Sequence, residues 1–186
     1  MQSKDESGTR SGPLEGVRVI DMTGVVMGPF ASQILADFGA DVIKVESPEG
    51  DTVRHIGPSK NKPGMGPMYL ALNRNKRSVV LDLRDGDALA ALERLIEGAD
   101  VLLFNLRPAS MGRLGLGYEQ VAKINPRIIY CGAYGFGEGG RYAGKPALDD
   151  LIQGAVSLPS LVGRVTGEPR YLPTNLCDRT TGLTAV

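Results

Sequence analysis

Short apolar runs alternate with amphipathic stretches along most of this chain. The runs are rich in β-branched and aliphatic residues and predict five strands, over residues 17–22, 41–46, 78–83, 100–105 and 127–133, the first of them buried. Apolar side chains recur at helical spacing over residues 30–38, 85–98 and 118–124. Strands alternating with helices at this pace predict an α/β fold, with a Rossmann-like, doubly wound and mostly parallel sheet flanked by helices.

The remaining segments carry weaker patterns. Residues 47–67 are rich in Pro, Gly and charge and predict a long loop, and residues 68–72 predict a short helix. Further along we expect a glycine-rich loop over 135–146, a helix over 148–158, and a turn with a short strand over 163–171. An extended run from Tyr171 stops at Asp178, which we expect where a last helix starts.

Composition narrows the class of protein. The chain has 186 residues, 42% of them hydrophobic, with 21 basic and 21 acidic side chains, so neither nucleic acid nor a membrane surface is an expected partner. No apolar run approaches a membrane span. The polar segment Met1–Gly12 is not a secretory signal and predicts a disordered leader, so we expect residues 13–186 to form the folded part, in the cytoplasm.

The residues that bind metals or form disulfides are few. Cys131 and Cys177 lie in apolar, strand-like contexts, which predicts reduced thiols rather than a disulfide. With His55 as the only histidine, their spacing matches no zinc pattern, and we expect no metal. His55 also lies in a polar loop with no G-x-S-x-G motif in the chain, which argues against a catalytic triad.

A glycine motif and a set of basic residues are the first candidates for ligand binding. Gly135–Gly140 fits G-x-G-x-x-G, but no helix follows it, so a loop that covers a site is a better interpretation than a dinucleotide fingerprint. Seven basic residues are each expected to be solvated, yet together they suit a phosphorylated ligand. They are Lys44, Arg74, Lys76, Arg77, Arg84, Arg107 and Arg113.

Acidic residues lie at two predicted helix starts. On position alone, Asp178 is best explained as a residue that satisfies free helix N–H groups, with a reactive carboxylate as the alternative. Asp149 and Asp150 are explained by the helix dipole or as partners within a site. Ligands of such sheets bind outside the carboxyl ends of the strands, and Asp178 is well placed to join that edge.

Several sequence blocks occur in the order found in the class III CoA-transferase family, the formyl-CoA and carnitine-CoA transferase type. The resemblance runs from about Pro13 to the last residue. It rests on Gly28-Pro29 with residues 35–46, on residues 75–83, 99–108 and 125–130, and on Asp149 to Gln153. It implies that this chain is the N-terminal, CoA-binding part of the large domain of such an enzyme.

The resemblance also implies a site and a reaction. Asp178 falls on the family's nucleophile, which attacks an acyl-CoA thioester and passes CoA to an acceptor carboxylic acid through an aspartyl-CoA thioester. Coenzyme A is then a substrate and no cofactor is bound permanently. A homodimer of interlocked chains is implied as well. The implied CoA contacts are Val26, Met27, Ser47, Leu81, Asp82, Leu83, Arg84, Asn105, Leu106, Arg107, Arg113 and Asp149.

Departures from the family pattern leave alternatives open. Val26 stands where the formyl-CoA branch has a glutamine and Ser47 replaces an arginine, which weakens oxalate or formate as expected substrates. Leu148 stands where related α-methylacyl-CoA racemases carry a catalytic histidine, so a racemase is disfavoured. The chain is about half the length of family members, so a non-catalytic module or subunit that binds CoA or acyl-CoA remains the main alternative.

Overall fold

The computed structural model describes residues 11–59 and 62–186, so the predicted leader lies almost wholly outside the described residues. The described chain forms a five-stranded sheet in the order β3-β2-β1-β4-β5, and every neighbouring pair is parallel. This confirms the predicted α/β fold. The strands are β1 (Arg18–Met22), β2 (Asp41–Glu46), β3 (Arg77–Val80), β4 (Val101–Phe104) and β5 (Ile129–Gly132).

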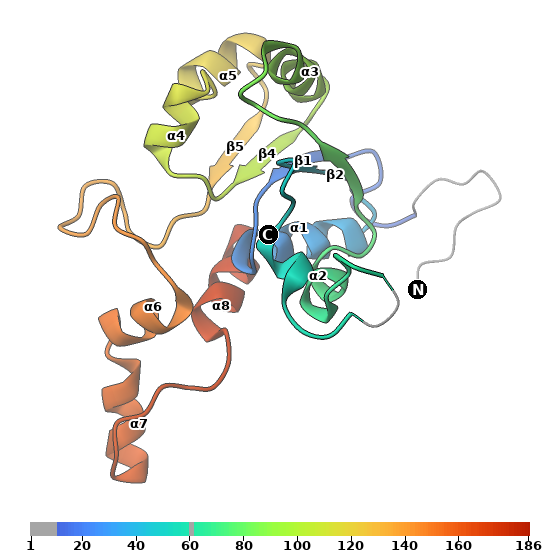
Figure 1. The fold of residues 1–186 in the computed structure, drawn as a ribbon. Coiled ribbons are helices and arrows are strands. Elements are labelled where there is room, and N and C mark those ends of the chain that lie inside the picture. The colour runs from blue at the N-terminus through green and yellow to red at the C-terminus, as the bar shows by residue number, and fades with distance from the viewer. Residues whose placement is uncertain (1–10, 60–61) are drawn as a thin grey trace.

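Helices cover both faces of the sheet (Figure 1). One face packs against α1 (Met27–Asp37), and α8 (Leu176–Ala185) lies against α1. The other face packs against α3 (Gly86–Glu97), α4 (Pro108–Arg113) and α5 (Tyr118–Ile124).

Alternation along the strands explains the two layers, because successive side chains of a strand point to opposite faces. Val19 packs in the layer of α1, whereas its neighbour Ile20 packs with Leu92 and Ile96 of α3. All four side chains are fully buried. Helix α3 also has the expected start, because the Asp85 carboxylate accepts a hydrogen bond from the N–H of Asp87 at 2.8 Å.

The segment that follows the glycine-rich loop differs from the prediction. It contains two helices, α6 (Asp149–Ala155) and α7 (Leu158–Thr166), where one helix and a short strand were expected. Ser157 separates them with a left-handed φ of 60°, and Gly167 ends α7 with a φ of 86°. The predicted strand is therefore wrong, and in Figure 1 the two helices extend away from the sheet.

Several boundaries also moved. Helix α1 begins three residues earlier than expected, and Cys177 and Asp178 both lie in the first turn of α8, so the strand-like context predicted for Cys177 is wrong. Both cysteines are free thiols. The short α2 (Pro67–Leu72) was predicted almost correctly, whereas α4 and the 3₁₀ turn η1 (Thr52–His55) were not expected.

Within the described ranges, no helix is both long and apolar enough to cross a membrane.

The strand order creates a crevice at the carboxyl edge of the sheet. β1 has β2 on one side and β4 on the other, so the connections that leave β1 and β4 run in opposite directions along the sheet. Ligands of open parallel sheets bind at such a switch point. The residues that follow β1, β2, β3 and β4 are therefore where a site is expected.

Candidate functional site

Three adjoining pockets follow the carboxyl edge of the sheet. The β2–β3 pocket has a volume of about 440 Å³, the β5 pocket about 610 Å³, and the Asp178 pocket about 580 Å³. Asn105, directly after β4, lines all three, and Met27 lines the last two. A smaller pocket of about 70 Å³ adjoins Met27 and Asp178. The crevice is therefore a continuous series of pockets that meet at Asn105.

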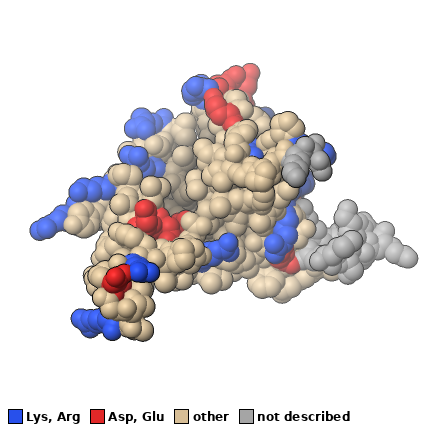
Figure 2. Space-filling view, turned by 60° about the horizontal axis from the view of Figure 1, so that its bottom comes forward, with Lys and Arg blue, Asp and Glu red and all other residues tan. Residues whose placement is uncertain are grey.

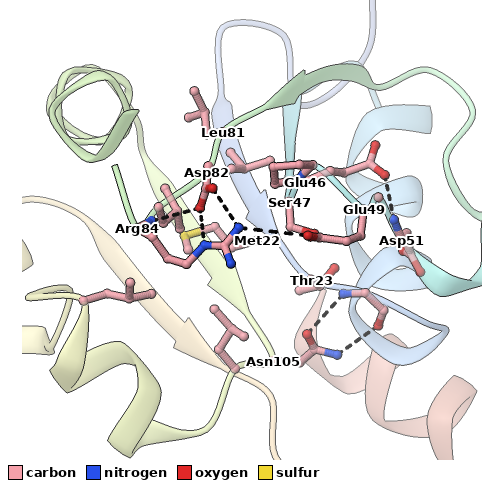
Figure 3. A pocket seen from close by; sticks show the side chains of 17 residues that line it. Met22, Thr23, Glu46, Ser47, Glu49, Asp51, Leu81, Asp82, Arg84 and Asn105 are labelled. Carbon is pink, nitrogen blue, oxygen red and sulfur yellow. Dashed lines mark hydrogen bonds and ion pairs between the residues drawn. The ribbon is translucent and has the colours of Figure 1, made fainter. Parts of the chain in front are cut away.

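The β2–β3 pocket is bordered by the loops that follow β2 and β3 (Figure 3). Leu81 and Leu83 supply apolar walls, and Ser47 lines the same pocket. The exposed Arg84 guanidinium donates to Asp82 Oδ2 at 2.8 Å and lies 4.0 Å from Glu49 Oε1. The hydrogen bond from Arg84 lowers the pKa of Asp82 and raises that of Arg84 itself. The rim of this pocket therefore carries one arginine between two carboxylates.

Asp178 stands in the first turn of α8 and is tied to α6. Its backbone N–H donates to Asp149 Oδ1 at 2.8 Å. The Asp149 carboxylate therefore satisfies one of the free N–H groups at the start of α8. The N-cap residue of α8, Asn175, makes no side-chain cap hydrogen bond.

Gln153 binds the chain segment that precedes α8 and Asp178. Its side chain is buried, with 2% of the residue exposed. Nε2 donates to Asp149 Oδ2 at 2.7 Å and to the Thr174 carbonyl at 3.2 Å, and Oε1 accepts the Leu172 N–H at 2.9 Å. One glutamine on α6 thus fixes both the chain that enters α8 and the carboxylate that caps α8.

The Asp178 carboxyl lies in an environment that disfavours its charge. Burial raises the pKa of Asp178, and the negative charge of Asp149 raises it further. Burial likewise raises the pKa of the neighbouring Cys177 thiol, with Asp149 and Asp178 adding to the effect. A carboxylate that is partly desolvated and faces a like charge is less stabilised by its surroundings, which favours its use as a nucleophile.

Four of the seven basic residues that were expected to suit a phosphorylated ligand form ion pairs with aspartates instead. Lys44 and Lys76 are buried in ion pairs with Asp51 and Asp21, each at 3.0 Å, and are structural. Arg74 pairs with Asp37, and Arg77 pairs with Asp41 at 2.6 Å near the opposite edge of the sheet. These four do not form the predicted phosphate site. On the face in Figure 2, basic side chains are dispersed and form no continuous patch.

Most of the residues expected to contact CoA lie along the three pockets. The β2–β3 pocket is lined by Ser47, Leu81, Asp82, Leu83, Arg84, Asn105 and Leu106. The β5 pocket adds Arg107, and the Asp178 pocket adds Val26, Met27, Asp149 and Asp178. Arg113 lines none of these pockets, and its guanidinium donates to Ser110 Oγ at 2.9 Å.

Residues that the sequence analysis did not single out also line the pockets. Ile56 and Met68 border the Asp178 pocket, and Tyr134 and Lys145 border the β5 pocket. Gln153 was missed as well, although its spacing of four from Asp149 on one helix was a usable signal. Within residues 11–59 and 62–186 no group of three potential metal ligands gathers.

The glycine-rich loop borders the β5 pocket. Gly135 and Phe136 line the β5 pocket, and a Cβ on Gly135 would lie 1.9 Å from the Cβ of Ala147. The loop therefore needs glycine at this position to pass the chain that enters α6. Nothing in its path resembles the start of a helix, which agrees with the rejection of a dinucleotide fingerprint.

Comparisons with known proteins agree on one family. The model of CoA-transferase family III matches residues 14–186. Succinate–glutarate CoA-transferase of Agrobacterium fabrum is 40% identical over 95% of this chain and 46% of its own length. Acetyl-CoA:oxalate CoA-transferase of Acetobacter aceti is 42% identical over 90% of this chain and 43% of its own. A CAIB/BAIF family protein from Brucella suis superposes with a TM-score of 0.90 at 38% identity, over 95% of this chain and 48% of that one. The chain thus spans about half the length of these relatives.

Proposed function

The chain belongs to CoA-transferase family III, and from this membership we propose that it carries the CoA-binding part and the nucleophile of an acyl-CoA:carboxylate CoA-transferase. The observation that supports the proposal best is the position of Asp178. It is a half-buried carboxylate on the first turn of a helix, in a pocket continuous with the crevice at the carboxyl edge of the sheet. The related enzymes move CoA between carboxylic acids, according to their names.

In the proposed reaction the Asp178 carboxylate attacks the thioester carbonyl of an acyl-CoA. The C–S bond breaks, CoA leaves as a thiolate, and an acyl-aspartyl anhydride remains. The thiolate then attacks the aspartyl carbonyl, which releases the donor acid as a carboxylate and leaves CoA on Asp178 as a thioester. An acceptor carboxylate repeats the two steps in reverse order and leaves as the new acyl-CoA, with Asp178 restored.

We propose that CoA spans the β2–β3 pocket and the Asp178 pocket, because Asn105 and Gly24 line both. Since the thioester has to reach Asp178, the nucleotide end then lies toward the β2–β3 pocket. CoA is a substrate in this scheme. We further propose a cytoplasmic protein, in line with its two free thiols, and a homodimer, in line with the apolar side chains that α6 and α7 expose.

Exchange of labelled CoA between two carboxylic acids tests the proposal. The assay uses the 186-residue chain and, should the reading frame continue past Val186, the longer protein. We expect Asp178→Ala to abolish exchange and the covalent CoA adduct that mass spectrometry detects in the unchanged protein. Asp150→Asn, a carboxylate change in the same pocket, serves as the control. Normal exchange by Asp178→Ala would show that Asp178 is not the nucleophile.

A non-catalytic CoA-binding module is the second candidate, because the chain covers only about half of its relatives. Calorimetric titration with CoA separates the two functions. Binding without exchange of CoA favours the module, and no binding at about 1 mM CoA excludes it.

A further inference from the structure

The turn between β1 and α1 is held by side chains from two other parts of the fold. Asn105 binds both polar groups of Gly24, since the Gly24 N–H donates to Asn105 Oδ1 at 3.1 Å and Asn105 Nδ2 donates to the Gly24 carbonyl at 2.9 Å (Figure 3). The next N–H, of Val25, donates to Asp51 Oδ1 at 3.2 Å. Asp51 is itself fixed by Lys44 at 3.0 Å, and both of these side chains are buried.

These contacts hold a strained conformation. Val25 has a φ of 72°, in the left-handed region that a β-branched residue rarely adopts. The residue is 48% exposed, so core packing does not account for the conformation. Residues in such conformations persist where their surroundings over-determine them. Here the surroundings are two hydrogen bonds of the Gly24–Val25 peptide, whose carbonyl accepts from Asn105 and whose N–H donates to Asp51.

The held turn is a wall shared by the pockets. Gly24 lines both the β2–β3 pocket and the Asp178 pocket, and the residues after the turn, Val26 and Met27, line the Asp178 pocket. A shift of the turn would therefore change the distance between the thioester of an acyl-CoA bound in the crevice and the Asp178 carboxylate. Misplacement of reacting groups by about 1 Å lowers rates by roughly a hundredfold.

We infer that Asn105, supported by Asp51, is a positioning residue that sets where the thioester of a bound acyl-CoA lies relative to Asp178. The inference rests on the proposed function. It differs from the role that the family resemblance implied for Asn105, a direct contact with CoA. The amide oxygen and one amide hydrogen of Asn105 are engaged by the backbone of Gly24.

Asn105→Ala tests the inference, with Asn125→Ala as a matched control. Asn125 makes a similar clamp remote from the pockets, since its Nδ2 donates to the carbonyls of Ile96 and Ala99 at 3.0 and 2.7 Å. We expect Asn105→Ala to lower kcat for CoA exchange by roughly ten- to a hundredfold. The Kd for CoA, measured by calorimetry, should change less than about threefold. Asn125→Ala should lower stability and leave kcat and Kd unchanged. A higher Kd with normal kcat at saturation would overturn the inference and restore the direct contact.

Val25→Gly changes the same turn and leaves the side chains of Asn105 and Asp51 unsubstituted. Glycine accepts the left-handed φ without strain, so this variant should fold even where Asn105→Ala does not, but glycine also accepts many other conformations and so leaves the turn less firmly fixed. We expect a several-fold lower kcat and an unchanged Kd for CoA, and a normal kcat would contradict the inference. In the Val25→Gly background, Asn105→Ala should cost less in kcat than in the unchanged protein, because the two residues act through one turn.

Failure of the proposed function gives a different result. If the unchanged protein catalyses no CoA exchange with any acyl-CoA, the proposed function is wrong, whatever the role of Asn105. A crystal structure of Asn105→Ala then tests the clamp alone. A displaced Gly24–Val25 peptide supports it, and an unmoved one overturns it.

Discussion

At the scale of single residues, the pair of Asp149 and Asp178 sets the pH range of the proposed chemistry. The charge of Asp149 contributes to the raised pKa of Asp178, so the reactive carboxylate is protonated at a higher pH than an exposed aspartate. Asp149→Asn removes this charge and keeps an oxygen for the Asp178 N–H. The pKa of Asp178 should fall, and the acidic limb of kcat/KM against pH should move to lower pH. Asp150→Asn should leave the limb in place. An unmoved limb in Asp149→Asn would show that the two carboxylates do not interact.

Glu46, whose pKa is lowered where that of Asp178 is raised, links the stability of the fold to pH. Burial alone would raise its pKa, but hydrogen bonds from Arg54, Ser78 and the backbone N–H of Asp51 lower it to about 2, from 4.5. A depressed carboxylate pKa stabilises the fold above the unfolded value and loses that contribution as pH falls toward 2. We expect the free energy of unfolding to fall by roughly 3 kcal/mol between pH 5 and pH 2 on this account.

Urea unfolding at a series of pH values measures this link. In Glu46→Gln the protein should be less stable at pH 7, because Arg54 loses its partner, and its stability should change less between pH 5 and pH 2. The exposed Glu97→Gln on α3 is the control. Equal slopes in Glu46→Gln and the unchanged protein would count against the depressed pKa.

At the scale of elements, the contact between α1 and α8 decides where Asp178 lies. Gly182 is buried at this contact, and a Cβ there would lie 2.8 Å from the Met27 carbonyl oxygen and 3.0 Å from Phe30 Cδ1. Gly182→Ala should push α8 from α1, lower the free energy of unfolding by ~1–3 kcal/mol and reduce CoA exchange.

Gly112→Ala is the matched control for this change. A Cβ on Gly112, inside α4, would meet nothing within 4 Å, so alanine should raise helix stability by ~0.5–1 kcal/mol. Thermal unfolding and exchange assays measure both variants. A Gly182→Ala protein as stable and as active as the unchanged one would mean that the α1–α8 contact tolerates displacement.

The elements that the sequence predicted well are those with a strong local pattern. Apolar runs located all five strands, and α5 agrees with its predicted bounds. Burial explains the apolar runs of β1, β2 and β4, whereas the edge strands β3 and β5 are exposed or half-buried. α7 was missed because Gly163 and Gly167 suit a turn as well as a helix end. The left-handed Ser157 that separates α6 from α7 leaves no sequence signal.

The candidate site was predictable to a similar extent. Parallel strands end at one edge of the sheet, so residues after β1 to β4 were expected to gather there, and Ser47, Arg84 and Asn105 do. The side-chain to backbone bonds that shape the site were not predictable. Gln153 and Asn105 bind chain segments 19 and 81 residues away, and only the tertiary fold brings these together.

At the scale of the whole molecule, apolar surface on α6 and α7 supports association. Leu151, Val156, Leu161 and Val165 are between 49% and 87% exposed. Large apolar side chains exposed on neighbouring helices favour an interaction surface. We expect light scattering to report a dimer, and we expect Val165→Glu to weaken it. Leu70→Glu, on the exposed side of α2, is the control. A monomer at micromolar concentration would contradict the proposed homodimer.

The exposure of helix α7 should make its backbone hydrogen bonds open readily. It has nine residues and no buried one, so little tertiary packing protects its hydrogen bonds. Helices this short are marginal without such packing. Its amides should therefore exchange with deuterated solvent far faster than those of β1 and β4, whose residues are largely buried. A covering surface, whether a second copy or further chain, would slow the exchange of α7 first, which makes these amides a reporter of assembly.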